Sequence, residues 1–362
     1  MSNSLAARKL ILFNFDAHGE IMQRCTTLIP AILLLFFCCN ELQAAPKYLF
    51  KIASLAPAGS IWIEQFENFA GEVEEKTGGE VGFRVYPGGV MGDDQSMYRK
   101  MRVGQLHGGG FTMTGISAVV PDFRVLSIPF LFKSYEEVDY VTKGLLPAFK
   151  ARFQEKGLEF IAMTEVGFIY AMSTEPIATV ESLRNSKNWS PSGDPVSEKY
   201  FSALGISSMQ LSIPDVLTSL QSGLVETVYN SLYGSIVLQW FTKARYIADV
   251  PYGYAYGVFA LDGAKFAGLP EAHRKAIQAA AQIHFPVLLE KTRESNIESR
   301  RVLETRGSRF LKIDKETVRV LSEKSEQSVK LLIPDSLSND IYDQVVRLRR
   351  EFRDKTTAVS TN

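Results

Sequence analysis

Cysteine is almost absent from this 362-residue chain, and its three cysteines, Cys25, Cys38 and Cys39, all precede residue 40. The rest of the chain can therefore form no disulfide and can supply no thiol nucleophile. A chain of this length does not need disulfides, because two domains of ordinary size bury enough apolar surface to fold.

An excess of either charge is also missing, since Lys+Arg and Asp+Glu both count 40. Nucleic-acid binding requires a basic excess on one face, so no nucleic-acid partner is expected. Beyond the first forty residues the histidines are His107, His273 and His284, and none is paired at metal-ligand spacing. Phosphate-loop, dinucleotide and nucleophile-elbow motifs are absent as well. We therefore expect no metal, no cofactor and no enzymatic activity.

The N-terminal region carries the order of a secretory signal peptide. Arg24 precedes the apolar run 28–37, and Leu42-Gln43-Ala44 follows it. The run is too short to span a bilayer comfortably, so we expect cleavage near Ala44, with an uncleaved membrane anchor as the alternative. Residues 1–21 fit no signal pattern, which suggests that translation begins at Met22.

Apolar periodicity predicts strands that alternate with helices. Strands are expected over 47–55, 81–86 and 108–114, with helical patterns over 62–73 and 93–103. A second series begins near Leu158, and 270–305 reads as one long helix that Pro286 should kink or split. Alternation of this kind predicts right-handed crossovers, mostly parallel sheets and an α/β fold. Two such lobes would face each other across a ligand cleft and close by a hinge.

Four segments between Tyr48 and Lys275 resemble the DctP-type solute receptors of TRAP (tripartite ATP-independent periplasmic) transporters. They are FAGEVEEKTGG (69–79), YPGGVMG (86–92), IPFLFK (128–133) and LQSGLVE (220–226). The resemblance implies a two-lobed periplasmic-binding-protein-like fold with a long bridging helix, a periplasmic location, a small-molecule ligand and integral membrane subunits as partners. It also implies a leader (1–45), lobe 1 (46–165), lobe 2 (166–255) and a C-terminal part (256–362) that completes both lobes.

The chain departs from that family at the position of its ligand arginine. In the family this arginine makes a bidentate contact with a carboxylate of the substrate. In this chain Trp189, within segment 187–195, occupies that position. A second position that is often basic follows the Gly-Phe pair of the family, and here it is Ile169. The motif Trp-x-Pro-x-Gly-Asp at 189–194 resembles a subset of the family that lacks the arginine.

Residues at the carboxyl ends of the strands and around Trp189 are the candidates for ligand contact. Trp189 could merely pack in the core, but its coincidence with the family's arginine favours a wall of the site. Asp194 is expected first to cap the helix that follows Pro195. The predicted ligand-binding residues are Leu55, Ser60, Gln95, Thr112, Thr114, Glu165, Trp189, Asp194, Asp215, Tyr229, Asn230, Trp240 and Tyr252.

These observations predict an exported receptor that captures a small organic ligand and delivers it to a TRAP-type transporter. Because indole replaces the arginine, the ligand is expected to be apolar, aromatic or larger than a simple carboxylate. One alternative is a receptor for an ordinary organic acid, with Lys187 or Arg184 as a relocated cation. A second alternative is an exported hydrolase that uses the carboxylates of Asp194 and Asp215.

Overall fold

The computed structural model describes residues 45–360, so the predicted leader and its cleavage site lie outside the described residues. The strands are β1 (Tyr48–Ser54), β2 (Val81–Tyr86), β3 (Gly108–Thr112), β4 (Leu158–Ser173), β5 (Asn188–Pro191), β6 (Ser208–Leu211), β7 (Thr227–Asn230), β8 (Tyr246–Ala248), β9 (Gly253–Asp262) and β10 (Arg309–Leu311). The α-helices are α2 (Ile61–Lys76), α3 (Asp94–Arg102), α4 (Met113–Ile116), α5 (Tyr135–Glu155), α6 (Val180–Arg184), α7 (Pro195–Leu204), α8 (Val216–Ser222), α9 (Leu232–Val237), α10 (Gly263–Ala267), α11 (Glu271–Thr305), α12 (Lys315–Val329) and α13 (Asn339–Ser360). Three short 3-10 helices are η1 (Pro121–Ser127), η2 (Ile213–Asp215) and η3 (Trp240–Thr242). Among these helices, none is long and apolar enough to cross a membrane.

The strands form two α/β lobes that share β4. The order along the sheet is β2-β1-β3-β9-β4-β7-β5-β6, and β8 lies beside β4 and β10. Pairing is parallel between β1 and β2, β1 and β3, β5 and β6, and β5 and β7. The pairs that involve β9 or β4 are antiparallel. The predicted two-lobed α/β fold is confirmed, with antiparallel strands added where the lobes join.

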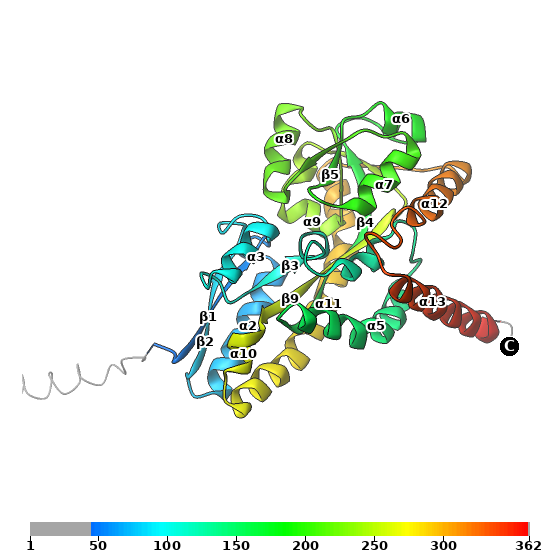
Figure 1. The fold of residues 1–362 in the computed structure, drawn as a ribbon. Coiled ribbons are helices and arrows are strands. Elements are labelled where there is room, and N and C mark those ends of the chain that lie inside the picture. Colours follow the sequence, from blue (N-terminus) through cyan, green and yellow to red (C-terminus); the bar gives the residue numbers. More distant parts are fainter. Residues whose placement is uncertain (1–44, 361–362) are drawn as a thin grey trace, which may run out of the picture. The chain divides into compact units, whose positions relative to one another are not determined.

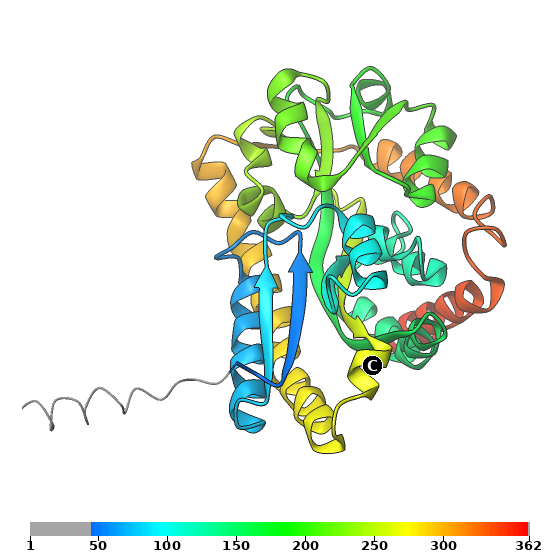
Figure 2. The same ribbon diagram turned by 60° about the vertical axis from the view of Figure 1, so that its left-hand side comes forward.

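Strand β4 runs from the first lobe into the second without a break (Figures 1 and 2). Its pairing with β9 extends from Leu158 to Ile169, and its pairing with β7 begins at Tyr170. A bulge between Glu165 and Gly167 interrupts the pairing at the crossing. Gly167 has a φ of +107°, and a Cβ there would lie 2.7 Å from Nδ2 of Asn296 on α11. Only glycine fits this combination of backbone angle and close helix approach.

Helix α11 spans 35 residues, about 52 Å at the helical rise, and packs against both lobes. Ile277, Phe285 and Leu288 belong to the core of the first lobe, whereas Leu303 belongs to that of the second. Pro286 was expected to kink or split this helix, and the split is excluded because the helix is continuous. Pro286 lies on the exposed face, so the carbonyl that it leaves without a donor can be hydrated.

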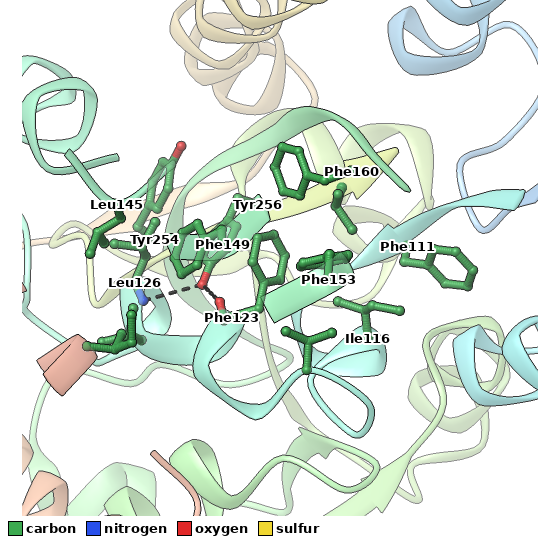
Figure 3. Packing of buried hydrophobic residues seen from close by; sticks show 14 of the residues in the cluster. Phe111, Ile116, Phe123, Leu126, Leu145, Phe149, Phe153, Phe160, Tyr254 and Tyr256 are labelled. Atoms are coloured by element: carbon green, nitrogen blue, oxygen red, sulfur yellow. Dashed lines mark hydrogen bonds between the residues drawn. The ribbon is translucent and has the colours of Figure 1, made fainter. Parts of the chain in front are cut away.

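An aromatic core fills the first lobe beneath β9 (Figure 3). Phe123 meets Phe149, Phe153 and Tyr256 in edge-to-face contacts with ring centroids 5.0–5.1 Å apart. The Tyr256 hydroxyl accepts from the backbone N–H of Leu126 at 3.3 Å and donates to the Phe123 carbonyl. These contacts hold η1 and β9 together at the base of the region between the lobes.

The C-terminal helices pack on different lobes. Helix α12 lies against α7, and α13 lies against α5 (Figure 1). The predicted strand 81–86 coincides with β2, and the helix predicted over 270–305 is α11. The strand predicted over 108–114 stops at Thr112, because the Thr112 hydroxyl caps α4 by accepting from the N–H of Gly115. Helix α5 was not predicted from the sequence.

Candidate functional site

Two adjoining cavities lie where the strand ends of both lobes meet. The first, which we call the aromatic chamber, has a volume of about 110 Å³. Its aromatic lining comes from β5, α7, β7, η3 and the start of β9, and consists of Trp189, Phe201, Tyr229, Trp240, Tyr252, Tyr254 and Tyr256.

The second cavity, which we call the inner chamber, has a volume of about 150 Å³ and reaches into the core of the first lobe. Its deep wall consists of Ile52, Ile63, Phe66, Val85, Phe259, Phe285 and Leu288. The two chambers share Thr112, Val166, Ile213, Asn230 and Tyr256. A dry, apolar cavity of this volume is large enough to hold a benzene ring.

Most of the predicted ligand-binding residues gather at these chambers. Leu55 lines the inner chamber, and Gln95 lines a small cavity of about 30 Å³ beside Thr112 and Thr114. The aromatic chamber is lined by Thr112, Thr114, Trp189, Asp194, Tyr229, Asn230, Trp240 and Tyr252. Because they come from β3, β5, β7 and the segments that follow, the carboxyl ends of parallel strands meet here as expected.

Three predicted residues do not line these cavities. Ser60 is the buried N-cap residue of α2, but its hydroxyl makes no capping bond. Asp215 is exposed and accepts a hydrogen bond from the hydroxyl of Ser212. Glu165 is 1% exposed and faces Arg293, whose Nη2 lies 2.7 Å from Oε2. Its carboxylate is thus engaged by the protein at the interlobe crossing.

Trp189 forms part of the chamber wall and also of the core of the second lobe. It is 3% exposed and meets Trp240 edge to face, with centroids 5.3 Å apart. Its Nε1 donates to the carbonyl of Leu211 at 3.0 Å. Because that N–H is used within the protein, Trp189 can offer a ligand only ring surface.

Among the described residues that line the aromatic chamber, Asp194 is the one that carries a charge, and it caps α7 as predicted. Its carboxylate accepts from the N–H groups of Val196 at 3.1 Å and Ser197 at 3.3 Å, and from the Ser197 hydroxyl at 2.5 Å. Burial raises the pKa of Asp194, although these hydrogen bonds and the nearby Arg124 act in the opposite direction. No lysine, arginine or histidine lines either chamber among residues 45–360.

Asp94 is a second buried carboxylate, at the edge of the cleft beside Thr112. The backbone N–H and the hydroxyl of Thr112 donate to it at 3.0 Å and 2.7 Å. Burial raises the pKa of Asp94 to about 6 against these bonds, and the adjacent charge of Asp93 raises it further. The ionised form is therefore destabilised by folding, since the ordinary value is 3.8.

We expect Asp94→Asn to increase the free energy of unfolding at neutral pH by up to about 3 kcal/mol, and to change it little at pH 4. The folded protein holds the Asp94 proton more tightly than the unfolded chain does, so wild-type stability falls as pH rises from about 4 through about 6. Urea denaturation of both proteins across that range measures the difference. Asp93→Asn is the control: burial opposes ionisation of Asp93, but bonds from Ser96 leave its pKa lowered, so its effect should have the opposite sign. A difference for Asp94→Asn that does not vary with pH would contradict the assignment.

Several lining residues were not singled out from the sequence. Ile213 and Val166 line both chambers, and Phe201 lines the aromatic chamber from α7. Phe285 and Leu288 reach the inner chamber from α11, more than 200 residues after β1. Apolar spacing could not have identified them as lining residues, because nothing local distinguishes a core face from a cavity wall.

No group of three or more His, Cys, Asp or Glu side chains in the described part of the chain could hold a metal ion. The chemistry that the chambers offer is therefore that of apolar contact, aromatic surface, one carboxylate and a few neutral polar groups.

Comparison with known proteins places this geometry in a family. A solute-binding protein of Verminephrobacter eiseniae is 25% identical over 218 residues, which cover 60% of this chain and 65% of the relative. One of Roseobacter denitrificans is 25% identical over 274 residues, covering 75% of this chain and 83% of the relative. A TRAP periplasmic solute-binding protein of Xanthobacter autotrophicus, solved with bound β-D-galacturonate, superposes with a TM-score of 0.78 at 19% identity, covering 83% of this chain and 99% of that one.

The matched proteins are solute-binding proteins rather than enzymes. The model for the DctP family, described as bacterial extracellular solute-binding protein, family 7, matches residues 52–334. That match covers both lobes, the two chambers and α11. This chain belongs to family 7 of the bacterial extracellular solute-binding proteins.

Proposed function

We propose that this protein is a periplasmic receptor that captures a small organic ligand and delivers it to the integral membrane subunits of a TRAP-type transporter. We further propose that the ligand is apolar, aromatic or larger than a simple carboxylate. The chambers between the two lobes would enclose it, with lobe boundaries near residues 165 and 255 and hinge closure about β4 and β9.

The observation that carries the ligand proposal is the absence of a cation from the lining of both chambers in the described residues. A desolvated carboxylate is costly unless a charged or hydrogen-bonding partner compensates it. Trp189 stands where the resemblance places an arginine, and the only N–H of its side chain is already bound to the carbonyl of Leu211. The apolar wall of the inner chamber supports a ligand with a sizeable non-polar part.

The alternative of a relocated cation is less well supported. Lys187 is 60% exposed and pairs with Glu226, and Arg184 donates to the carbonyl of Leu204 and pairs with Glu181. Both side chains thus have partners on the surface of the second lobe and do not line either chamber.

Two of the similar proteins were solved with bound acids. The Xanthobacter protein holds β-D-galacturonate and the Roseobacter protein holds L-galactonate. They support a receptor for small organic molecules, whereas the lining of these chambers argues for a ligand other than a sugar acid.

We expect titration calorimetry with the purified protein to show no binding of galacturonate at concentrations that saturate the Xanthobacter receptor, and no binding of succinate at the same concentrations. We also expect Trp189→Arg to create at most weak binding of these acids, because the surrounding pocket is shaped for an apolar ligand. Mass spectrometry of the molecule that co-purifies with the protein should reveal a compound whose apolar part is larger than that of either acid. Micromolar binding of either acid by the wild type would refute the ligand proposal.

A further inference from the structure

We propose that the ligand is an organic cation, an amine on an apolar or aromatic body, with its charged nitrogen in the aromatic chamber beside Asp194. This inference rests on the proposed receptor function, because it assigns the charge of the captured molecule. Four features of the aromatic chamber carry it, namely its charge, the polarity of its hydroxyl groups, the anchoring of its rings and its neighbour, the inner chamber.

The charge of the chamber is acidic. Asp194 is 6% exposed, and three donors, two N–H groups and one hydroxyl, use only part of the roughly four lone-pair positions of a carboxylate. The charge of Arg124 acts on Asp194, but the guanidinium of Arg124 donates to the backbone carbonyls of Ser117 and Ser336. A ligand cation would relieve the cost of keeping this carboxylate buried and ionised.

Three of the hydroxyl groups that line the chamber are already used as donors. Thr112 Oγ1 donates to Asp94 at 2.7 Å, Ser197 Oγ donates to Asp194 at 2.5 Å, and Ser127 Oγ donates to the Arg124 carbonyl at 2.7 Å. A hydroxyl has a single hydrogen, so these three can present only lone pairs to a ligand. Such groups attract a donor or a positive charge and repel a carboxylate.

The aromatic side chains are anchored by their polar atoms. Tyr229 donates to Asn188 Oδ1 at 2.7 Å, and Tyr254 donates to Glu165 Oε2 at 2.9 Å. The indole N–H of Trp189 is bound to Leu211, as described above. These side chains therefore offer ring surface rather than hydrogen-bond donors. Several aromatic side chains that line one chamber beside a carboxylate match the composition of the cages that bind ammonium groups.

The side-chain amide of Asn230 can donate to a neutral acceptor on the ligand. The Oδ1 atom of Asn230 accepts from the N–H of Ser231, and no described protein group accepts from its Nδ2. Asn230 borders both chambers. A ligand whose amine lies in the aromatic chamber and whose apolar body enters the inner chamber would pass this amide.

Matched probes test the charge directly. Titration calorimetry would compare phenethylamine, phenethyl alcohol and 3-phenylpropanoate, which share an aromatic ring and differ in the charge of the polar end. We expect the amine to bind at least about tenfold more tightly than the alcohol, and the acid to bind most weakly.

Asp194→Asn isolates the carboxylate, because asparagine caps helices as well as aspartate does. We expect this change to weaken the binding of the amine by at least about tenfold and to change the affinity for the alcohol by no more than about twofold. Glu198→Gln is the control, since Glu198 is an exposed acid in the first turn of the same helix. It should change neither affinity.

The possible outcomes separate the two proposals. Equal binding of amine and alcohol, an unchanged amine affinity in Asp194→Asn, or no amine binding at millimolar concentration would overturn the cation inference and leave an uncharged apolar ligand in place. Tightest binding of 3-phenylpropanoate would also overturn the cation inference, whereas micromolar binding of galacturonate or succinate would overturn the proposed ligand class.

Discussion

Replacing Arg293 by methionine is expected to lower the free energy of unfolding by about 3–5 kcal/mol. Arg293 on α11 reaches Glu165 on β4 and Asp139 on α5, with Nη2 2.7 Å and 2.6 Å from their carboxylate oxygens. Its guanidinium also lies over the ring of Tyr135, 4.4 Å from the centroid. Without Arg293, the carboxylate of Glu165 is left buried with only the hydroxyl of Tyr254 as a donor. An uncompensated buried charge of this kind is among the costliest defects in a fold.

The effect should depend on pH in a defined direction. Burial already raises the pKa of Glu165, and Arg293 and Tyr254 offset part of that increase. In Arg293→Met the pKa of Glu165 must rise further, so the variant should recover stability as acid protonates the carboxylate. Urea denaturation at pH 8 and pH 5 would measure a larger loss at the higher pH.

The double variant Glu165→Gln with Arg293→Met serves as the control. It removes the buried charge together with its partner, so it should be more stable than Arg293→Met alone. The stability of Arg293→Lys should lie between that of the wild type and that of Arg293→Met. Lysine keeps the positive charge but loses the planar fork of N–H donors that binds two carboxylates. If the double variant were as unstable as the single one, the loss would come from packing of the arginine stem rather than from charge.

The strands of the first lobe could be predicted because local signals mark their ends. Gly78 and Gly79 both adopt positive φ and stop α2 immediately before β2. An apolar strand bounded by such glycines leaves little freedom in where it begins. The same logic identified the Asp194 cap, since Asp before a first-turn Pro is a strong helix start.

Helix α5 was not predicted from the sequence, because its stability depends on packing against a segment far away in the chain. Gly144 and Pro147 interrupt its helical pattern and lower its intrinsic propensity. In the fold, Gly144 faces α13, and a Cβ there would lie 2.6 Å from the side chain of Leu348. Tertiary packing between segments 200 residues apart thus stabilises a helix that local preference disfavours.

The candidate site also contains both residues that the sequence could predict and residues whose role it could not. Thr112 and Asn230 were predicted from the rule that ligands bind at the carboxyl ends of parallel strands, and both line the chambers. Glu165 was predicted to contact the ligand, but its partner Arg293 lies 128 residues away along the chain. Sequence patterns can place a residue at an edge of the sheet. Whether its side chain contacts the ligand or another protein group depends on contacts between segments far apart in the chain.

Replacing Trp189 by alanine is expected to lower the free energy of unfolding by about 3–5 kcal/mol and to weaken the ligand by at least about tenfold. The loss of stability and the loss of affinity are expected to have the same structural cause. The indole is 3% exposed, packs on Trp240 and bonds to the Leu211 carbonyl, so its removal opens the second-lobe core into the aromatic chamber. Chemical denaturation measures the first effect, and titration calorimetry on folded protein in the cold measures the second.

Leu303→Ala distinguishes a binding wall from a residue that only supports the fold. Leu303 is fully buried in the same core cluster as Trp189 and lines neither chamber. Its truncation should cost about 2–5 kcal/mol of stability without changing ligand affinity. Trp189→Phe should fall between wild type and Trp189→Ala in both measurements, because it keeps a ring and loses the bond to Leu211. If Trp189→Ala bound its ligand as tightly as Leu303→Ala does, Trp189 would be a core residue alone, and the aromatic chamber would have to recognise the ligand through its other rings.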